Sequence, residues 1–380
     1  MSRYLIVTWD GAGNLVSTLG IAQRLAEQGH DVRLLGHRSI DQRVGSHGWR
    51  FRPLERTFDF DSTAPMDPDL EMATMSRELW LGGSVARDVL DELEREPADV
   101  LVADAMLLGA ISAGEAAGIP TVALFHAAYA LMRGGMLVDL LSPALPDLNT
   151  VRAELGLPAV DGIPEVHDAC TLNLVALPRE FEPPIPVPDN VRFIGPVLDG
   201  PALSRTTDEL VVADGPEPLV VVSLSTSYQG QVELIQRLVD ALGSLPVRVV
   251  VTTGPAVEHG SIRPAANTTV VGFVPHTALL PNASLVVTHA GLGTVMASLG
   301  HGVPMLCVPM GRDQFFNASR VEELGAGRML GPDANEETIA QVVRELLDDP
   351  GAREGAKRMA GVIAGYGGAD DAVAELARLG

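Results

Sequence analysis

Short apolar runs alternate with amphipathic stretches along most of this chain, so strands are expected to alternate with helices. Strands are predicted at residues 4–8, 31–35, 100–102, 121–125, 220–224, 285–287 and 304–308, and helices at residues 19–28 and 109–117. This alternation is typical of parallel sheets joined by crossover helices, and it predicts the α/β class.

The domain organisation follows from length and from one break in the pattern. The chain has 380 residues, more than one compact core normally holds, so two domains are expected. Residues 201–218 are rich in Pro, Gly and Asp and show little periodicity, which is typical of a linker. An N-terminal domain is predicted at residues 1–200, a C-terminal domain at 219–365, and a final helix within 366–380.

The most specific motif follows the predicted strand at 285–287, where the chain reads His289-Ala-Gly291-Leu-Gly293-Thr294. A helix is expected to begin near Thr294, and its first turn would carry unpaired N–H groups and about half a unit of positive charge. Gly291 and Gly293 let backbone N–H groups approach a ligand closely, and His289 can add a side-chain donor. A diphosphate would fit this turn without a metal ion or a lysine. The alternative is an ordinary tight turn of a parallel α/β domain.

A second motif weakens that alternative. The strand predicted at 304–308 precedes a loop that bears Asp313 and Gln314, and residues 313–318 read Asp-Gln-Phe-Phe-Asn-Ala. The acceptor and donor groups of Asp313 and Gln314 suit the hydroxyl groups of a sugar. Together the two motifs predict a site for a nucleotide sugar.

These motifs resemble the donor signature of the GT-B nucleotide-sugar-dependent glycosyltransferases of the macrolide and UDP-glucuronosyl type, common in bacterial natural-product pathways. The resemblance extends to Phe273, Val274 and Pro275, which match the segment whose backbone meets the uracil or thymine base. It also includes Ser225 and Thr226, near the phosphates, although the family usually has Gly where Ser225 stands. It is strong over the C-terminal half and holds in outline over the N-terminal half.

The resemblance implies a GT-B fold, with two Rossmann-like, doubly wound parallel-sheet domains that face each other across a cleft. The final helix would cross back to the N-terminal domain. The implied activity is an inverting, metal-independent transfer of a sugar from a UDP- or dTDP-sugar donor to a small apolar or aromatic acceptor. Oxygen and carbon are both open as the atom that receives the sugar, and no cofactor is expected besides the donor substrate.

The catalytic base does not carry over from the family. There, a histidine or an aspartate follows the second glycine of the first turn, but here this position is Asn14, whose amide cannot abstract a proton at neutral pH. Three replacements follow predicted strands: Asp10, Asp104 and His126. Asp10 and Asp104 rank first on position, and Asp104 stands where the family has the carboxylate that orients its histidine. The imidazole of His126 titrates closest to neutral pH. For each of the three, a turn cap or a buried structural role remains the alternative.

Residues 58–81 mix acidic residues with methionines and aromatic residues, and we interpret them as an acceptor-side loop. Tyr129, Met132 and Met136 would add a second apolar group, and ordinary packing is the alternative for both groups. Asp59-Phe60-Asp61 has the form of a metal-binding D-x-D pattern, but an acidic loop is more often a solvated face. No metal site is predicted.

The net charge, the apolar runs and the cysteines of the sequence restrict the expected binding partners and cellular location. A net charge of -22 argues against nucleic acid and anionic membrane surfaces as partners. The sequence has no long apolar run, and it contains two cysteines, Cys170 and Cys307, so a disulfide framework is not expected. A cytoplasmic protein is predicted, with a small-molecule acceptor and a nucleotide-sugar donor as its partners. The oligomeric state stays open, a homodimer included.

Two other functions remain open from the sequence. Asn14 would suit a non-catalytic relative that binds nucleotide and acts as a partner protein. The turn that contains Gly11 and Gly13 partly matches a dinucleotide-binding fingerprint, and Arg38 could meet an NADP phosphate. The third glycine of that fingerprint would fall at Val16, so an NADP-dependent reductase is the lesser alternative.

Overall fold

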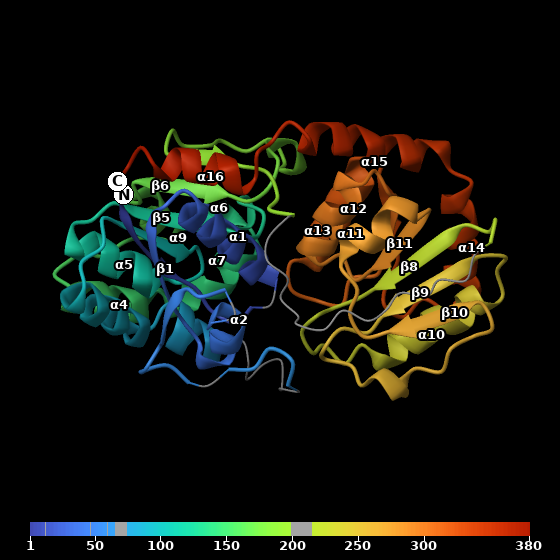
Figure 1. Cartoon of the computed structure of the whole chain (residues 1–380), viewed down its shortest axis with the longest axis horizontal. Coiled ribbons are helices and arrows are strands. Elements are labelled where there is room, and N and C mark those ends of the chain that lie inside the picture. The colour runs from blue at the N-terminus through green and yellow to red at the C-terminus, as the bar shows by residue number, and fades with distance from the viewer. Residues whose placement is uncertain (12, 46, 59, 65–73, 199–214) are drawn as a thin grey trace. The chain divides into compact units, whose positions relative to one another are not determined.

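The computed structural model describes residues 1–11, 13–45, 47–58, 60–64, 74–198 and 215–380 (Figure 1). The chain divides into two compact units. The first contains Met1–Asp61, Met66–Leu203 and Tyr366–Gly380, and the second contains Ser62–Pro65 and Ser204–Gly365. Most of the predicted linker, residues 201–214, lies outside the described residues, as does Asp59 of the D-x-D pattern.

The first unit is built on a seven-stranded parallel sheet with the order β3-β2-β1-β4-β5-β6-β7. The direction of winding reverses between β1 and β4, and in doubly wound sheets ligands bind beyond the carboxyl ends of the strands at such a point. The strands are β1 (Arg3–Val7), β2 (Asp31–Gly36), β3 (Arg50–Pro53), β4 (Val100–Asp104), β5 (Thr121–Phe125), β6 (Leu172–Val175) and β7 (Val191–Phe193).

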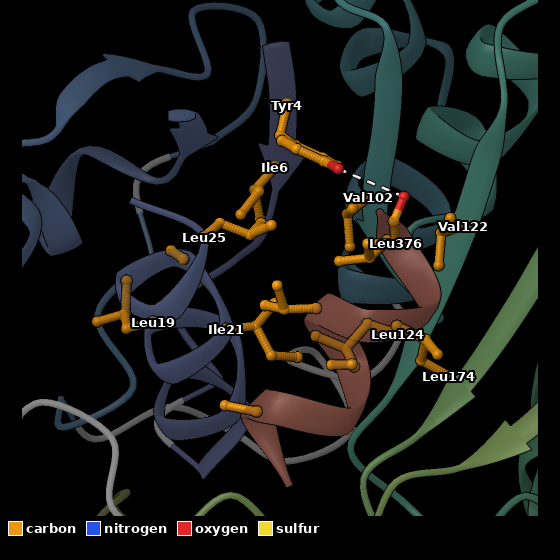
Figure 2. Packing of buried hydrophobic residues seen from close by; sticks show 14 of the residues in the cluster. Tyr4, Ile6, Leu19, Ile21, Leu25, Val102, Val122, Leu124, Leu174 and Leu376 are labelled. Carbon is orange, nitrogen blue, oxygen red and sulfur yellow. Dashed lines mark hydrogen bonds between the residues drawn. The ribbon is translucent and has the colours of Figure 1, made fainter. Parts of the chain in front are cut away.

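Helices cover this sheet because alternate residues of its central strands are apolar toward both faces. On one face, Ile6 and Val102 pack with residues of α1 and α16, and the hydroxyl group of Tyr4 donates a hydrogen bond to the carbonyl of Leu376, 3.3 Å away (Figure 2). The helices are α1 (Gly13–Glu27), α2 (Asp41–Gly45), α4 (Gly83–Arg95), α5 (Leu108–Ala117), α6 (Leu131–Gly134), α7 (Met136–Leu141), α8 (Leu145–Glu154), α9 (Ile163–Asp168) and α16 (Ala369–Leu376), with a π-helical turn at Met75–Trp80.

The second unit contains a six-stranded parallel sheet with the order β10-β9-β8-β11-β12-β13. Val222, Val251 and Val287 lie at the centre of its core. The strands are β8 (Leu219–Ser223), β9 (Arg248–Thr252), β10 (Thr268–Val271), β11 (Leu285–Thr288), β12 (Met305–Cys307) and β13 (Gly327–Met329). The helices are α10 (Val232–Gly243), α11 (His276–Leu279), α12 (Leu292–Gly300), α13 (Gln314–Glu323), α14 (Glu336–Leu347) and α15 (Pro350–Ile363). These two parallel sheets confirm the predicted α/β class.

The prediction for α1 was wrong at its start: the helix begins at Gly13, six residues before the predicted residue 19. Residues 14–18 read Asn-Leu-Val-Ser-Thr, and four of these five residues have low helix propensity, but Leu15 is fully buried against the sheet and its packing outweighs that propensity. The correction matters because it places Asn14 in the first turn of the helix, directly beyond the carboxyl end of β1.

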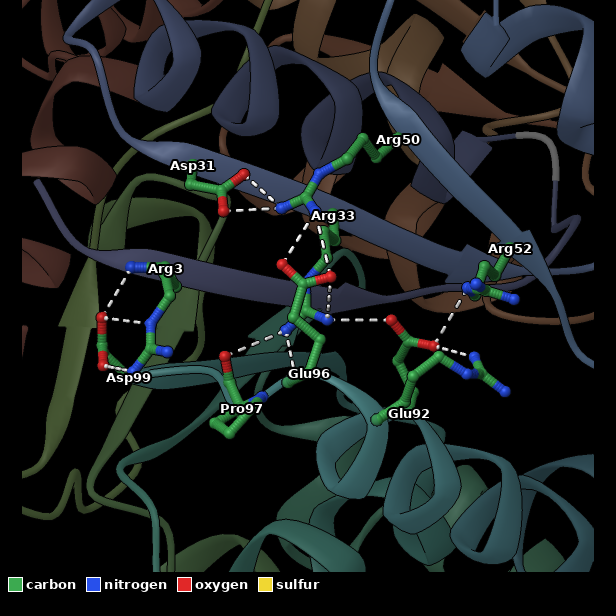
Figure 3. Close-up of polar contacts among 10 residues, drawn as sticks. Arg3, Asp31, Arg33, Arg50, Arg52, Glu92, Glu96, Pro97 and Asp99 are labelled. Carbon is green, nitrogen blue, oxygen red and sulfur yellow. Dashed lines mark hydrogen bonds and ion pairs between the residues drawn. The ribbon is translucent and has the colours of Figure 1, made fainter.

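The opposite edge of the first sheet, where its strands begin, carries a network of ion pairs (Figure 3). Buried Arg33 of β2 lies 2.9 Å from Glu92 of α4 and also donates to the carbonyl of Glu96 at 2.6 Å. Arg3 pairs with Asp99 at 2.6 Å, and Arg50 joins the same network. These pairs tie the beginnings of β1, β2 and β3 to the segment that connects α4 to β4.

Candidate active site

The turn between β11 and α12 has a strained backbone that several contacts hold in place. Ala290 has φ 64°, in the left-handed region that costs a non-glycine residue about 1–2 kcal/mol. Its N–H donates to Thr288 Oγ1 at 3.3 Å, and its carbonyl accepts from Asn317 Nδ2 at 3.0 Å. Gly291 is the N-cap of α12, which begins at Leu292, two residues before the predicted Thr294. The turn therefore directs the N-terminus of a nine-residue helix beyond the carboxyl end of β11.

His289 lies in this turn as a neutral imidazole. Burial, with a smaller contribution from the charge of Arg312, lowers its pKa to about 3. At neutral pH the ring has one N–H to donate, to the backbone of Ser223 or to a ligand, and it adds no positive charge. A Cβ on Gly291 would lie only 2.4 Å from His289 Nε2, so glycine at this position is required by the imidazole ring. A Cβ on Gly293 would meet nothing within 4 Å, so the space beside it is open.

Arg312 supplies the positive charge that a neutral His289 lacks, although the sequence motif does not single it out. It has φ 54° and an exposed side chain, and its Nη1 donates to Ser227 Oγ at 2.9 Å. The guanidinium group is also close enough to lower the pKa of His289. The signal in the sequence was an arginine directly before Asp313, but one charge in a loop usually indicates a solvated side chain.

Ser225 and Gln314 belong to one hydrogen-bond network that fixes two loops. Ser225 Oγ accepts from Gln229 Nε2 at 2.6 Å, and Gln229 Oε1 accepts from Gln314 Nε2 at 2.8 Å. Gln314 Oε1 in turn accepts from the N–H groups of Met310 and Gly311 at 2.8 and 3.2 Å. Gln314 is buried, and most of its hydrogen-bonding capacity serves the loop after β12, which leaves one amide hydrogen for a ligand.

The remaining predicted donor residues lie at the same edge of the second sheet. Asp313 is the N-cap residue of α13 and is half-buried, and its carboxylate accepts a hydrogen bond from Asn317 Nδ2 at 2.9 Å. Thr226 is exposed after β8, and Thr294 is buried in the first turn of α12. Phe273, Val274 and Pro275 connect the end of β10 to α11. Because all the strands are parallel, the carboxyl ends of β8, β10, β11 and β12 carry these groups at one edge.

In the first unit, three predicted residues meet at the carboxyl end of β4. Asn14 Nδ2 donates to Asp104 Oδ2 at 2.8 Å, and His126 Nδ1 lies 3.1 Å from the same oxygen. The N–H of Met106 donates to Asp104 Oδ1 at 3.0 Å. These contacts join the ends of the adjacent strands β1, β4 and β5. They place Asn14, Asp104 and His126 at the point where the winding of the sheet reverses.

Asp10, the fourth candidate, is held differently. Its side chain is fully buried and accepts a hydrogen bond from Ser39 Oγ at 2.8 Å, while its N–H donates to His37 Nδ1 at 3.2 Å. Ser39 and His37 follow β2, so these contacts direct Asp10 toward the end of β2. Its carboxylate connects the turn after β1 to the segment after β2.

Aromatic rings surround His126. Trp9 lies at the centre of a group that we call the Trp9 cluster, with ring centroids 5.8 Å from Trp80, 6.3 Å from Phe60 and 6.5 Å from His126. The indole N–H groups of Trp9 and Trp80 are buried, and neither has a hydrogen-bond partner in the described part of the chain. The carboxyl edge of the first sheet thus combines an imidazole with a group of aromatic rings that are tilted to one another, of which Phe60 and Trp80 are buried.

Several residues of the predicted acceptor groups prove to be packing residues. Met75 and Leu79 are buried in the π-helical turn, and Tyr129 and Met132 are buried in the first unit, because their side chains fill its core. Met136 is 44% exposed. The rest of the acceptor segment, residues 65–73, lies outside the described residues.

No group of at least three His, Cys, Asp or Glu side chains in the described ranges could hold a metal ion. No helix among them has the length and apolar character needed to cross a membrane.

The chain is similar in sequence to known glycosyltransferases. Residues 236–377 match the family model described as the C-terminal domain of erythromycin biosynthesis protein CIII-like proteins. The chain is 29% identical to 4'-demethylrebeccamycin synthase of Lentzea aerocolonigenes, in an alignment that covers 98% of each protein. It is 28% identical to demethyllactenocin mycarosyltransferase of Streptomyces fradiae, covering 97% of this chain and 84% of that protein.

The fold is also that of solved glycosyltransferases. The glycosyltransferase VinC, solved in complex with dTDP, aligns with a TM-score of 0.77 at 20% identity and covers 99% of both chains. This likeness to solved structures shows the GT-B fold. The chain is a glycosyltransferase with a GT-B fold, and along almost its whole length it is similar to glycosyltransferases of natural-product pathways.

Proposed function

We propose that this enzyme transfers a sugar from a UDP- or dTDP-sugar to a small apolar or aromatic acceptor, with inversion at the anomeric carbon and without a metal ion. The observation that carries the donor half of the proposal is the β11–α12 turn. There, a helix N-terminus, the N–H of a neutral His289 and the cation of Arg312 occur together. Such a combination suits the two negative phosphates of a nucleoside diphosphate.

Each part of the donor has a candidate partner in the second unit. Backbone groups of Phe273, Val274 and Pro275 would meet the uracil or thymine base. The diphosphate would lie against the start of α12, beside His289 and Arg312. Thr226 and Thr294 lie at the same carboxyl edge of the second sheet and would be near it. Asp313 and the remaining amide hydrogen of Gln314 would bind sugar hydroxyl groups. Ser225 and the open space beside Gly293 would shape the phosphate-binding loops.

Charge compensation explains why a metal ion is unnecessary in this proposal. Negative charge grows on the departing diphosphate in the transition state, and fixed donors at that point are each worth about 3–4 kcal/mol. Arg312 and the first N–H groups of α12 would provide this stabilisation. No cofactor besides the donor substrate is proposed.

The acceptor half of the proposal rests on the Trp9 cluster. Trp9 is the half-buried ring of this cluster and lies edge-on to His126, so an aromatic acceptor beside His126 would pack against it. Direct attack by the acceptor on the face opposite the diphosphate would invert the anomeric carbon.

Calorimetric titration with UDP, dTDP and NADPH, each with and without Mg²⁺, tests the donor site. We expect UDP or dTDP to bind equally well with and without the metal. His289→Ala and Arg312→Ala should each weaken diphosphate binding about 10- to 100-fold, because each removes a buried or charge-assisted hydrogen bond. Arg344→Ala, which removes an exposed arginine of α14, is the matched control. Binding of NADPH alone would contradict the proposal.

Turnover with a panel of phenols and aromatic alcohols tests the reaction. We expect release of UDP or dTDP in step with formation of a glycoside, whose anomeric configuration, read by NMR coupling constants, is opposite to that of the donor. Retention of configuration, or release that requires Mg²⁺, would contradict the proposed mechanism while leaving the donor site in place.

A further inference from the structure

Asp104, at the end of β4, is the common partner of Asn14 in α1 and of His126, which directly follows β5. Its Oδ2 accepts from Asn14 Nδ2 at 2.8 Å and lies 3.1 Å from His126 Nδ1, and its Oδ1 accepts the N–H of Met106 at 3.0 Å. The carboxylate can only accept, so the hydrogen of the neutral imidazole belongs on Nδ1 of His126. Nε2 is then the nitrogen that carries the lone pair. Asp104 thus fixes both the tautomer and the orientation of the ring.

Exposure separates His126 from the other candidate bases. The side chain of Asp104 is 1% exposed and Asp10 is fully buried, whereas the side chain of His126 is 21% exposed. A base must come within about 3 Å of the acceptor proton, directly or through one water molecule. Of the three groups, His126 is the one that reaches the surface. Trp9 packs beside it, and an acceptor would lie there.

We propose that His126 is the catalytic base of the transfer, and that Asp104 and Asn14 are positioning residues for it. This proposal rests on the glycosyltransferase function proposed above and names a residue for its acceptor step. The base would thus have moved from the first turn of α1, where Asn14 stands, to the end of β5. Asp104 serves both arrangements because β4 lies between β1 and β5.

The role of Asn14 follows from its contacts. Its amide donates to Asp104 Oδ2, to the carbonyl of Trp9 at 3.1 Å and to Thr8 Oγ1 at 3.3 Å. It therefore holds the same carboxylate oxygen that faces the imidazole, without competing for the acceptor proton. A histidine at position 14 would compete with His126 for the charge of Asp104, and a neutral amide does not.

The reaction step balances as follows for an oxygen acceptor. His126 Nε2 takes the hydroxyl proton while the acceptor oxygen forms a bond to the anomeric carbon of the sugar. The bond from that carbon to the diphosphate oxygen breaks, and its electron pair leaves with the nucleoside diphosphate. The imidazolium that forms is stabilised by the carboxylate of Asp104 and then returns its proton to solvent. The products are the glycoside, the nucleoside diphosphate and one proton.

The test compares His126→Gln with the wild-type enzyme on acceptors of different acidity. With aliphatic alcohols we expect kcat to fall about 100- to 10,000-fold, the usual contribution of a general base. With acidic phenols, which ionise without help, the loss should be much smaller. Calorimetric binding of UDP or dTDP should not change, because the donor residues belong to the second unit. His47→Gln, an exposed histidine that stacks on Trp49, is the matched control.

Further variants distinguish a base from a structural role. Asp104→Asn and Asn14→Ala should lower kcat more than they raise the acceptor KM, with the same dependence on acceptor acidity as His126→Gln. Added imidazole should restore turnover to His126→Gly in proportion to its concentration. An equal loss on every acceptor, or no rescue, would show that His126 is structural. An acidity-dependent loss in Asp10→Asn, with none in His126→Gln, would assign the base to Asp10.

The outcome for the base is separable from the outcome for the function. If wild-type enzyme releases nucleoside diphosphate with at least one acceptor, the glycosyltransferase proposal stands, and the His126 variants decide the base. If it releases none with any acceptor although UDP or dTDP binds, the acceptor class proposed above is wrong and the base proposal falls with it.

Discussion

The two edges of the first sheet differ in how their polar side chains are satisfied. At the amino edge, where the strands begin, Arg33 and Glu92 are both buried and lie 2.9 Å apart, and Glu92 also pairs with Arg52 and Arg95. At the carboxyl edge, Trp9 Nε1, Asn14 Oδ1 and Trp80 Nε1 are buried, and none has a hydrogen-bond partner in the described part of the chain. At the amino edge, Asn173 Oδ1 near the start of β6 is also buried and has no partner among these residues.

This difference indicates that the two edges have different roles. A buried polar atom without a partner costs about 1–3 kcal/mol, so the unpartnered atoms at the carboxyl edge lower the stability of the folded chain. At the amino edge, charged groups are matched and serve to hold strands and the α4–β4 connection together. The comparison indicates that the sheet is fastened at one edge and reserved for substrates at the other. Substitutions at the two edges should therefore have opposite effects on stability and turnover.

The largest effect on stability should come from Arg33→Met at the amino edge. The change leaves Glu92 buried beside fewer cations and removes donors to the carbonyls of Glu96 and Pro97. Breaking a buried pair in this way costs about 3–5 kcal/mol. Urea unfolding should show this loss, while kcat per folded molecule stays unchanged because the substitution is far from the carboxyl edge.

Arg3→Ala is the matched control at the same edge. The side chains of Arg3 and of its partner Asp99 are 43% and 36% exposed. Exposed pairs contribute about 0–1 kcal/mol, so the free energy of unfolding should hardly change. A large loss in both variants would mean that the whole network, and not the buried pair, fastens this edge.

The sequence predicted the α/β fold with parallel sheets, and its motifs single out most of the candidate residues that lie at the carboxyl edge of the second sheet, because both depend on local patterns. Strands such as β5 and β11 are continuous apolar runs, and His289, Gly291 and Asp313 belong to a contiguous motif. In contrast, Arg312 is recognisable as a site residue only once its guanidinium is seen to reach Ser227, 85 positions away in sequence.

The acceptor side shows the same limit. Asp10, Asp104 and His126 all follow strands, so the sequence could place them at one edge but could not rank them. Their ranking depends on which side chain reaches solvent and which oxygen is shared, and these follow from the strand order β1-β4-β5. The early start of α1 was missed because the burial of Leu15 is a tertiary effect.

Acid should weaken the carboxyl edge before the amino edge. Burial lowers the pKa of His167, which bonds to the carbonyl of Ala105 after β4, to about 4 from an ordinary 6.5. Below 6.5 the unfolded chain takes up a proton that the folded chain does not, so the free energy of unfolding should fall by about 1.4 kcal/mol per pH unit down to about pH 4.

The amino edge responds at lower pH. Arg3 lowers the pKa of Asp99 from 3.8 to about 2, so its contribution is complete above 3.8 and is lost as the pH falls toward 2. Urea unfolding of wild type and His167→Gln at several pH values checks both statements. Between pH 6 and 4, the free energy of unfolding of the variant should depend on pH less steeply than that of the wild type, by about 1.4 kcal/mol per pH unit. An unchanged slope would place the acid sensitivity in other groups.

The carboxyl edge of the second sheet offers a matched pair of glycines. Gly291→Ala would place a methyl group 2.4 Å from His289 Nε2, so the imidazole must move and diphosphate affinity should fall about 10-fold. Gly293→Ala meets no atom of the protein within 4 Å, so the fold should tolerate it. Calorimetry with UDP and urea unfolding measure the two effects. If Gly293→Ala also weakens UDP binding at unchanged stability, the diphosphate occupies the space beside it.

The smallest effect sharpens the comparison most directly, because it sets two asparagines of the first unit against each other. Asn14→Ala should lower kcat about 10-fold, since it removes one hydrogen bond to the carboxylate of Asp104, and it should leave UDP affinity unchanged. Its cost in stability should be small, because the substitution also removes the unpartnered Oδ1. Asn149→Ala removes two satisfied hydrogen bonds to the backbone of Val160, both 2.9 Å, and should show the reverse: lower stability with unchanged kcat per folded molecule. If Asn14→Ala instead destabilises the chain as much as Asn149→Ala does and leaves kcat unchanged, the carboxyl edge is fastened in the same way as the rest of the unit, and the division of work between the two edges does not hold.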